Sequence, residues 1–181
     1  MLAVFSQTLA PTPDSDNNGH PGSVDFLKDE SLVVKHFQSL DSAPVIFKIG
    51  SSALMAYSPD STNGSGSWSF DSRGDIFCLF KGSIENVLDE PKDRMGPVNY
   101  IARVIEACKA VPPPPPGFTK LLPLRQFTGN FAVIFYDANE KHVIVHPGRD
   151  EYELYRGFDS AGNIVVSDDP VVVEKACSKT C

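Results

Sequence analysis

A nearly unbroken run of apolar positions covers residues 131–136. The run is rich in β-branched and aromatic residues, follows Gly129, and is closed by the turn formers Asp137 and Asn139. Its length and composition predict a β-strand, and its lack of a polar side predicts a strand buried on both faces. Such a strand needs one layer above it and one below, so the pattern predicts a layered fold.

Other apolar or alternating runs predict the remaining strands. Residues 76–80 have the same character as residues 131–136, and we expect the two to pair as the core of a sheet. Residues 45–49 and 53–57 are separated by a short connection that contains Gly50, which is typical of a hairpin. The other predicted strands cover residues 2–5, 45–49, 53–57, 68–70, 141–146, 152–155 and 163–167.

Three segments have the apolar spacing of a helix. The first begins near Asp25 and reaches Leu40, and the second covers residues 99–110. The third covers residues 170–177, since the proline that opens it suits a first helical turn. The acidic pair at 168–169 could bind a cation, but at a helix start it is more typical of a cap.

The segments between these elements are rich in turn formers. Residues 10–23 and 58–67 contain Pro, Gly, Asp, Asn and Ser in high proportion and predict exposed, flexible loops. Residues 112–116 are five consecutive prolines, which favour a polyproline II conformation. They could bind a proline-recognising domain, but their place inside the domain favours a rigid connector.

Size and charge limit the classes of function. With 181 residues, 41% of them hydrophobic, we expect residues 1–181 to form one domain. A net charge of -7 argues against nucleic acid as a partner. No apolar run approaches the roughly 20 residues of a membrane-spanning helix, and the N-terminus does not resemble a secretory signal. The sequence therefore predicts a cytoplasmic protein, with the nucleus as a second location.

The four cysteines do not form a metal-binding motif. Cys78 lies in a predicted strand and Cys108 on the apolar side of a predicted helix, where thiols usually pack in the core. Cys177 and Cys181 are four residues apart, and the nearest histidines belong to a separate strand. Two candidate ligands without partners do not complete a site, so we expect no metal and no cofactor.

The order of the elements predicts an α+β domain with mostly antiparallel strands. Four blocks of sequence, residues 76–86, 104–109, 129–137 and 157–169, resemble the plant stem-specific and aluminium-induced protein family in the same order. The opening residues match that family too, so the resemblance covers nearly the whole chain. It implies a domain similar to the glutaminase domain of class II glutamine amidotransferases. The fold expected from it is a four-layer αββα sandwich of the N-terminal-nucleophile hydrolase type.

The chain departs from this family at two motifs. The family's Tyr-Gly-Leu motif falls near Met95-Gly96-Pro97, where only the glycine remains. Its Leu-Arg-Asp-Arg motif would follow Lys109, where this chain continues into the proline run. Members usually extend past the position of Cys181, so we expect a divergent, shorter member or a truncated chain.

The residues that the resemblance implies for catalysis are also replaced. Leu2 stands where a cysteine after the initiator Met would attack the amide, with its own α-amine as base. Lys81 and Gly82 match the Asn-Gly pair that would hold the oxyanion, so only the Gly82 backbone donor remains. The acidic residue that would bind the substrate's α-amine aligns near Pro97. We therefore expect no catalytic residues, and a vestigial substrate cleft at these four positions.

Two classes of function remain open from the sequence. The first is a non-catalytic amidotransferase-like module, a stress-responsive regulatory or interaction protein that binds an unidentified protein or small ligand. The second is a residual amidohydrolase of the glutaminase type whose nucleophile is not identified. A homodimer is also expected, because two-fold dimers are the commonest assembly.

Overall fold

The computed structural model describes six ranges of the chain, residues 1–6, 32–40, 43–59, 67–85, 127–147 and 152–177. The predicted helix at 99–110, the loop at 10–23 and the polyproline connector at 112–116 lie outside these ranges. The chain divides into two compact units. Unit 1 consists of Met1–Ser61 and Glu153–Cys181, and unit 2 of Thr62–Tyr152.

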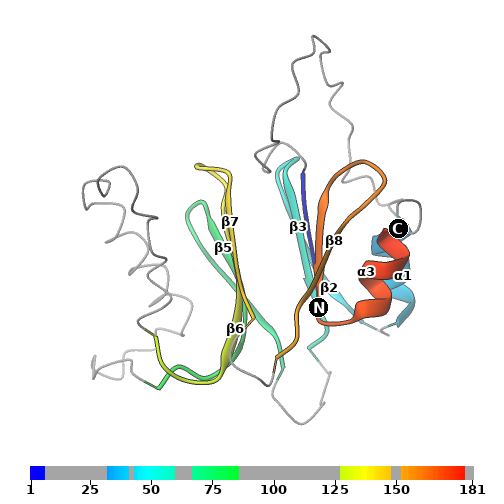
Figure 1. The fold of residues 1–181 in the computed structure, drawn as a ribbon. Helices are drawn as coiled ribbons and strands as arrows, with labels where there is room; N and C mark the ends of the chain where they lie inside the picture. Colours follow the sequence, from blue (N-terminus) through cyan, green and yellow to red (C-terminus); the bar gives the residue numbers. More distant parts are fainter. Residues whose placement is uncertain (7–31, 41–42, 60–66, 86–126, 148–151, 178–181) are drawn as a thin grey trace, which may run out of the picture. The chain divides into compact units, whose positions relative to one another are not determined.

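Unit 1 contains a five-stranded sheet in the order β2-β3-β1-β9-β8, and every pair in it is antiparallel (Figure 1). The N-terminal strand β1 is thus the central strand, paired with β3 on one side and β9 on the other. The bounds are β1 Leu2–Phe5, β2 Val45–Ile49, β3 Ala53–Tyr57, β8 Tyr155–Phe158 and β9 Ile164–Ser167. The predicted hairpin of β2 and β3 is confirmed.

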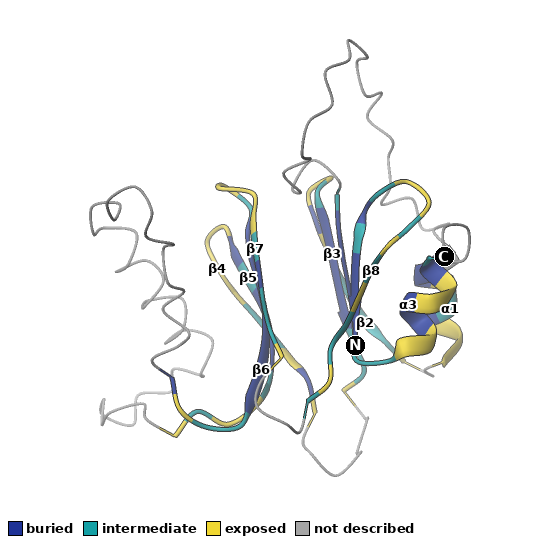
Figure 2. Cartoon of the chain, viewed as in Figure 1, coloured by how far each residue is buried: buried dark blue, intermediate teal, exposed yellow. Residues whose placement is uncertain are grey.

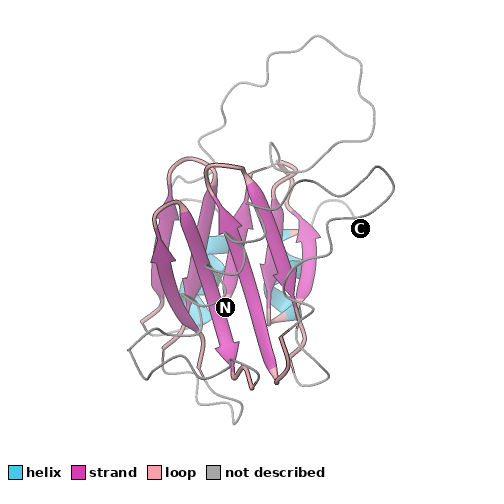
Figure 3. Ribbon diagram, turned by 90° about the vertical axis from the view of Figure 1, so that its left-hand side faces the viewer, coloured by secondary structure: helices cyan, strands magenta, loops and turns pink. Residues whose placement is uncertain are grey.

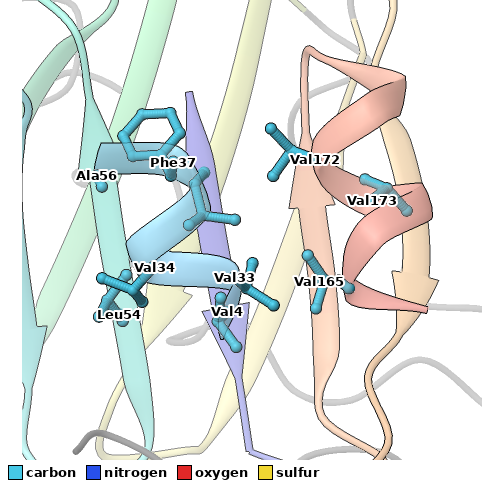
Figure 4. Close-up of a cluster of buried hydrophobic side chains, with 11 residues drawn as sticks. Val4, Val33, Val34, Phe37, Leu54, Ala56, Val165, Val172 and Val173 are labelled. Atoms are coloured by element: carbon cyan, nitrogen blue, oxygen red, sulfur yellow. The ribbon is translucent and has the colours of Figure 1, made fainter. Parts of the chain in front are cut away.

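Two helices, α1 (Leu32–Leu40) and α3 (Pro170–Ala176), cover one face of this sheet (Figure 4). Their apolar residues point toward the strands, and burying a Val, Leu or Phe side chain stabilises the fold by about 1.5–3 kcal/mol. The core cluster on this face consists of Leu2, Val4, Val33, Val34, Phe37, Leu54, Ala56, Val165, Val172, Val173 and Ala176. Figure 2 shows each helix buried on its inner side and exposed on its outer side.

The start of α3 confirms the predicted cap. Asp169 has an extended backbone, and its carboxylate accepts a hydrogen bond of 2.8 Å from the Val171 N–H. Pro170 occupies the first helical turn, where its missing N–H costs nothing. An acidic residue at this position also interacts favourably with the helix dipole.

Unit 2 contains a four-stranded antiparallel sheet in the order β4-β5-β6-β7 (Figure 3). All seven residues of β6, Phe131–Asp137, are buried, which confirms the strand predicted to be buried on both faces. Its predicted pairing with β5 is confirmed as well, over seven residue pairs. The remaining bounds are β4 Ser69–Arg73, β5 Ile76–Gly82 and β7 His142–His146.

Aromatic side chains form much of the unit 2 core. Phe131 stacks on Phe80 at 6.1 Å and on the His146 ring at 5.1 Å, and meets the edge of Phe127 at 6.3 Å between ring centroids. Such aromatic pairs add about 0.5–1.5 kcal/mol to what burial alone contributes. Cys78 is fully buried in the same cluster, as predicted for a core thiol.

The bounds of two predicted strands were wrong. Strand β8 covers Tyr155–Phe158 rather than residues 152–155, because the turn after it fixes where pairing begins. In that turn the Asp159 carboxylate accepts hydrogen bonds from the backbone N–H groups of Ala161 and Asn163. Strand β4 extends to Arg73, beyond residues 68–70, because its pairing with β5 continues to the turn at Gly74.

The described residues therefore form an α+β structure with antiparallel sheets and two helices, as predicted at that level. The four-layer αββα sandwich stays a prediction from the resemblance.

Candidate functional site

Leu2, the residue at the nucleophile position, lies in the middle of the unit 1 sheet. It pairs with Ala56 on β3 and Ser167 on β9, and its side chain is fully buried. The side chain belongs to the cluster between the sheet and the two helices, next to Val4 on the same face of β1. Position 2 therefore holds a core residue.

The backbone around Leu2 is fixed by polar contacts at Met1. The Met1 ammonium group donates a hydrogen bond to the Asp168 carboxylate and forms an ion pair with it. The Ser167 hydroxyl donates to the Met1 carbonyl at 2.6 Å and accepts from the Asp169 N–H at 3.1 Å. These contacts join β1 to the segment that opens α3.

Lys81 and Gly82, the positions of the oxyanion pair, end strand β5 in unit 2. The Lys81 ammonium lies over the Tyr152 ring, 5.4 Å from its centroid, in a cation–π contact. A lysine in place of an asparagine has no neutral amide donor, and this one is placed against an aromatic ring. The Lys81 side chain thus contributes to packing at the end of the strand.

Gly82 lies where two backbone segments approach closely. Its φ is +100°, and a Cβ there would stand 2.2 Å from the Asn130 carbonyl oxygen. Gly129, on the second of the two segments, is in the same situation. Its φ is +125°, and a Cβ there would stand 2.4 Å from the Ser83 carbonyl oxygen. Only glycine fits such positions without strain.

Hydrogen bonds explain why the two segments approach. The Ser83 N–H donates to the Asn130 carbonyl, and the Glu85 N–H donates to the Thr128 carbonyl, both at 2.8 Å. The pairing of β5 and β6 thus continues past the end of the regular strands. The close approach at Gly129 was not predicted from the sequence, although a glycine beside a strand often marks a close approach of two backbones.

The proposed vestigial cleft is thus described at three of its four positions. Leu2 belongs to unit 1, whereas Lys81 and Gly82 belong to unit 2. Pro97, the fourth position, lies outside the described residues. Each of the three described positions has a structural role within its own unit.

The described residues include a buried thiol and no cluster of metal ligands. Burial, with a smaller contribution from the Asp71 charge, raises the pKa of the Cys78 thiol, so this residue stays protonated and unreactive. Among the residues described, no group of three or more His, Cys, Asp or Glu side chains could hold a metal ion. Nor is any helix in these ranges both long and apolar enough to cross a lipid bilayer.

Comparison with known protein families agrees with the blocks found in the sequence. The family model described as "Aluminium induced protein" matches residues 2–181. The chain belongs to the aluminium-induced protein family. None of the curated protein sequences matches it. The family part of the sequence resemblance is therefore confirmed over nearly the full length of this aluminium-induced protein.

His146 gives this aluminium-induced protein a dependence of stability on pH. Burial against Phe131 lowers the pKa of His146 below its usual 6.5, the hydrogen bond to its backbone acting weakly the other way. The unfolded chain then binds the proton more readily than the folded chain. The stabilising contribution is complete above pH 6.5 and is lost as pH falls from there through the folded-state pKa.

We expect the free energy of unfolding to fall more between pH 7.5 and 5.5 for the natural chain than for a His146→Phe variant. Phenylalanine keeps a ring against Phe131 and removes the titrating group. Urea unfolding of both proteins at the two pH values measures the difference, in which the other titrating groups cancel. Equal losses in the two proteins would show that His146 does not titrate differently on folding.

Proposed function

We propose that this member of the aluminium-induced protein family is a non-catalytic amidotransferase-like module that acts in a stress response by binding a protein or small ligand. The proposal combines the family membership with the state of the positions that amide hydrolysis would need. Function depends on the site and not on the fold, so those positions carry the argument.

The observation that carries the proposal is the environment of Leu2. Its side chain has no exposed surface and packs with aliphatic residues of the strands and helices. An aliphatic side chain cannot attack an amide carbon. A thiol in the same cluster would be surrounded by apolar groups, which disfavour the thiolate that attacks.

The oxyanion position supports the same conclusion. Lys81 lies over the Tyr152 ring, and Gly82 is held against the backbone of Asn130. Stabilising a tetrahedral oxyanion requires preorganised donors aimed at one point. Here the matching side chain is engaged in packing, and the matching glycine is explained by backbone approach alone.

The fold of unit 1 agrees with an amidotransferase-like origin. Its central strand begins at Leu2, directly after the first residue, and is paired on both sides. In an N-terminal-nucleophile enzyme of the class that the sequence resembles, the reactive residue would stand at this place. We infer that the scaffold remains while the chemistry has been lost.

The test is release of ammonia and glutamate, or aspartate, from glutamine and asparagine. The purified chain is compared with a Leu2→Cys variant, and the intact mass of each protein records which residue is at its N-terminus. We expect no release above the enzyme-free blank from either protein, because Lys81 and Pro97 replace two further groups of the site.

Hydrolysis by the natural chain would overturn the proposal and favour the alternative, a residual amidohydrolase with an unidentified nucleophile. Circular dichroism of the Leu2→Cys variant shows that its silence is not due to unfolding. If that variant hydrolyses glutamine while the natural chain does not, loss of the nucleophile alone accounts for the inactivity.

A further inference from the structure

Strand β8 lies at the edge of the unit 1 sheet. Among the described residues it pairs with β9 alone, and β9 separates it from the central strand. Its outer side therefore presents backbone N–H and C=O groups to which no described strand is bonded. Such an edge is a template for one more strand.

A groove of about 760 Å³ follows this edge, between β8, the turn after it and one side of α3. Its floor includes Gly157, Val173 and Cys177. A Cβ on Gly157 would lie 2.3 Å from the Cys177 sulfur and 2.8 Å from a Val173 methyl group, so the glycine lets α3 pack close to the strand. The groove thus gives a second strand both backbone partners and an apolar surface.

The side chains of β8 alternate between the two faces. Tyr155 and Gly157 face α3, whereas Arg156 and Phe158 are exposed on the other face. Phe158 is 52% exposed, and in the described ranges only Leu40 and Val171 are other large apolar residues with such exposure. An exposed aromatic residue beside a free sheet edge is typical of an interaction surface.

We propose that β8 pairs in antiparallel fashion with β8 of a second copy of the chain, which joins two five-stranded sheets across a two-fold axis. A second copy fits because the surface is complementary to itself. On the face away from α3 it carries a cation at Arg156 and an aromatic ring at Phe158, which attract each other, and a two-fold interface places one patch against the same patch. This dimer does not depend on the proposed function, since an active hydrolase could associate by the same edge.

The charge on Arg156 disfavours one register of the two strands and favours another. In a continuous antiparallel sheet, residues opposite each other point to the same face, so the two-fold axis must pass midway between the two copies of one residue. An axis at residue 156 would place two Arg156 side chains opposite each other, which destabilises the pair. An axis at Gly157 places Arg156 opposite Phe158 of the second copy, twice, with each guanidinium able to lie over a ring.

Light scattering coupled to size-exclusion chromatography tests the association. We expect the natural chain at micromolar concentrations to have twice its 19.7 kDa mass and Phe158→Gln to have the mass of one chain. Leu40→Gln is the matched control, because Leu40 is 53% exposed on α1 and should leave the dimer intact. A monomeric natural chain at all concentrations, or a Phe158→Gln variant that still dimerises, would overturn the proposal.

Cysteine cross-linking tests the register. Chains with Arg156→Cys mixed with chains with Phe158→Cys should form a disulfide-linked dimer under mild oxidation, since opposite positions of an antiparallel pair allow disulfide geometry. Each variant alone should cross-link no more than the natural chain, which measures the background from its own cysteines. Cross-linking of Arg156→Cys alone at a higher level than the mixture would overturn the register.

Discussion

Replacement of Gly82 by alanine is expected to lower the free energy of unfolding by about 3 kcal/mol or more. Two costs combine at this residue. Its φ of +100° is unfavourable for any residue with a Cβ, and the new methyl group would stand 2.2 Å from the Asn130 carbonyl oxygen and 2.9 Å from the Phe131 Cα. Both obstacles are backbone atoms, which cannot move aside without breaking the pairing of β5 and β6.

Gly74→Ala separates the two costs. Gly74 also has a positive φ, +57°, but a Cβ there meets nothing within 4 Å. We expect this variant to lose only about 1–2 kcal/mol, the cost of the left-handed conformation alone. Urea unfolding of both variants measures the difference. If the two lose the same stability, the close approach at Gly82 does not exist in solution.

Phe131→Ala is expected to cost about 3–5 kcal/mol, the range for removing a buried phenylalanine. The side chain is 2% exposed and contacts the rings of Phe80, Phe127 and His146. Its removal leaves a cavity in the unit 2 core and ends all three ring contacts. The midpoint of urea or thermal unfolding should fall accordingly.

Two further substitutions show whether the loss comes from this core. Phe131→Leu keeps most of the volume and should cost less than about 1.5 kcal/mol. Leu40→Ala removes an exposed apolar side chain and should change stability by about 0.5 kcal/mol or less. A Phe131→Ala variant as stable as Leu40→Ala would contradict the packing described for β6.

The parts of the fold that could be predicted from the sequence are those with a strong local signal. The uninterrupted apolar run at β6 indicated a strand buried on both faces, and Asp169 with Pro170 indicated the start of α3. The span of β8 was harder to place, because residues 152–155 have an apolar and aromatic pattern, whereas pairing with β9 covers Tyr155–Phe158. Strand bounds were therefore the main error.

The candidate site shows a different limit. The sequence identified Leu2 as an unsuitable nucleophile, but could not show which way its side chain points. All four residues of β1 are buried, so the strand has no alternation of apolar and polar positions from which to assign faces. The close approach of the backbone segments at Gly82 and Gly129 was also not predicted, because these segments are distant in sequence. Only the structure places them together.

We propose that this aluminium-induced protein does not hydrolyse amides, and ammonia release from glutamine by the natural chain is the decisive measurement. The natural chain is measured at rising protein concentration beside a heat-denatured sample of the same preparation. We predict rates equal to those of the denatured sample at every concentration. A rate that increases in proportion to the native protein would show that the protein hydrolyses glutamine with a nucleophile other than residue 2.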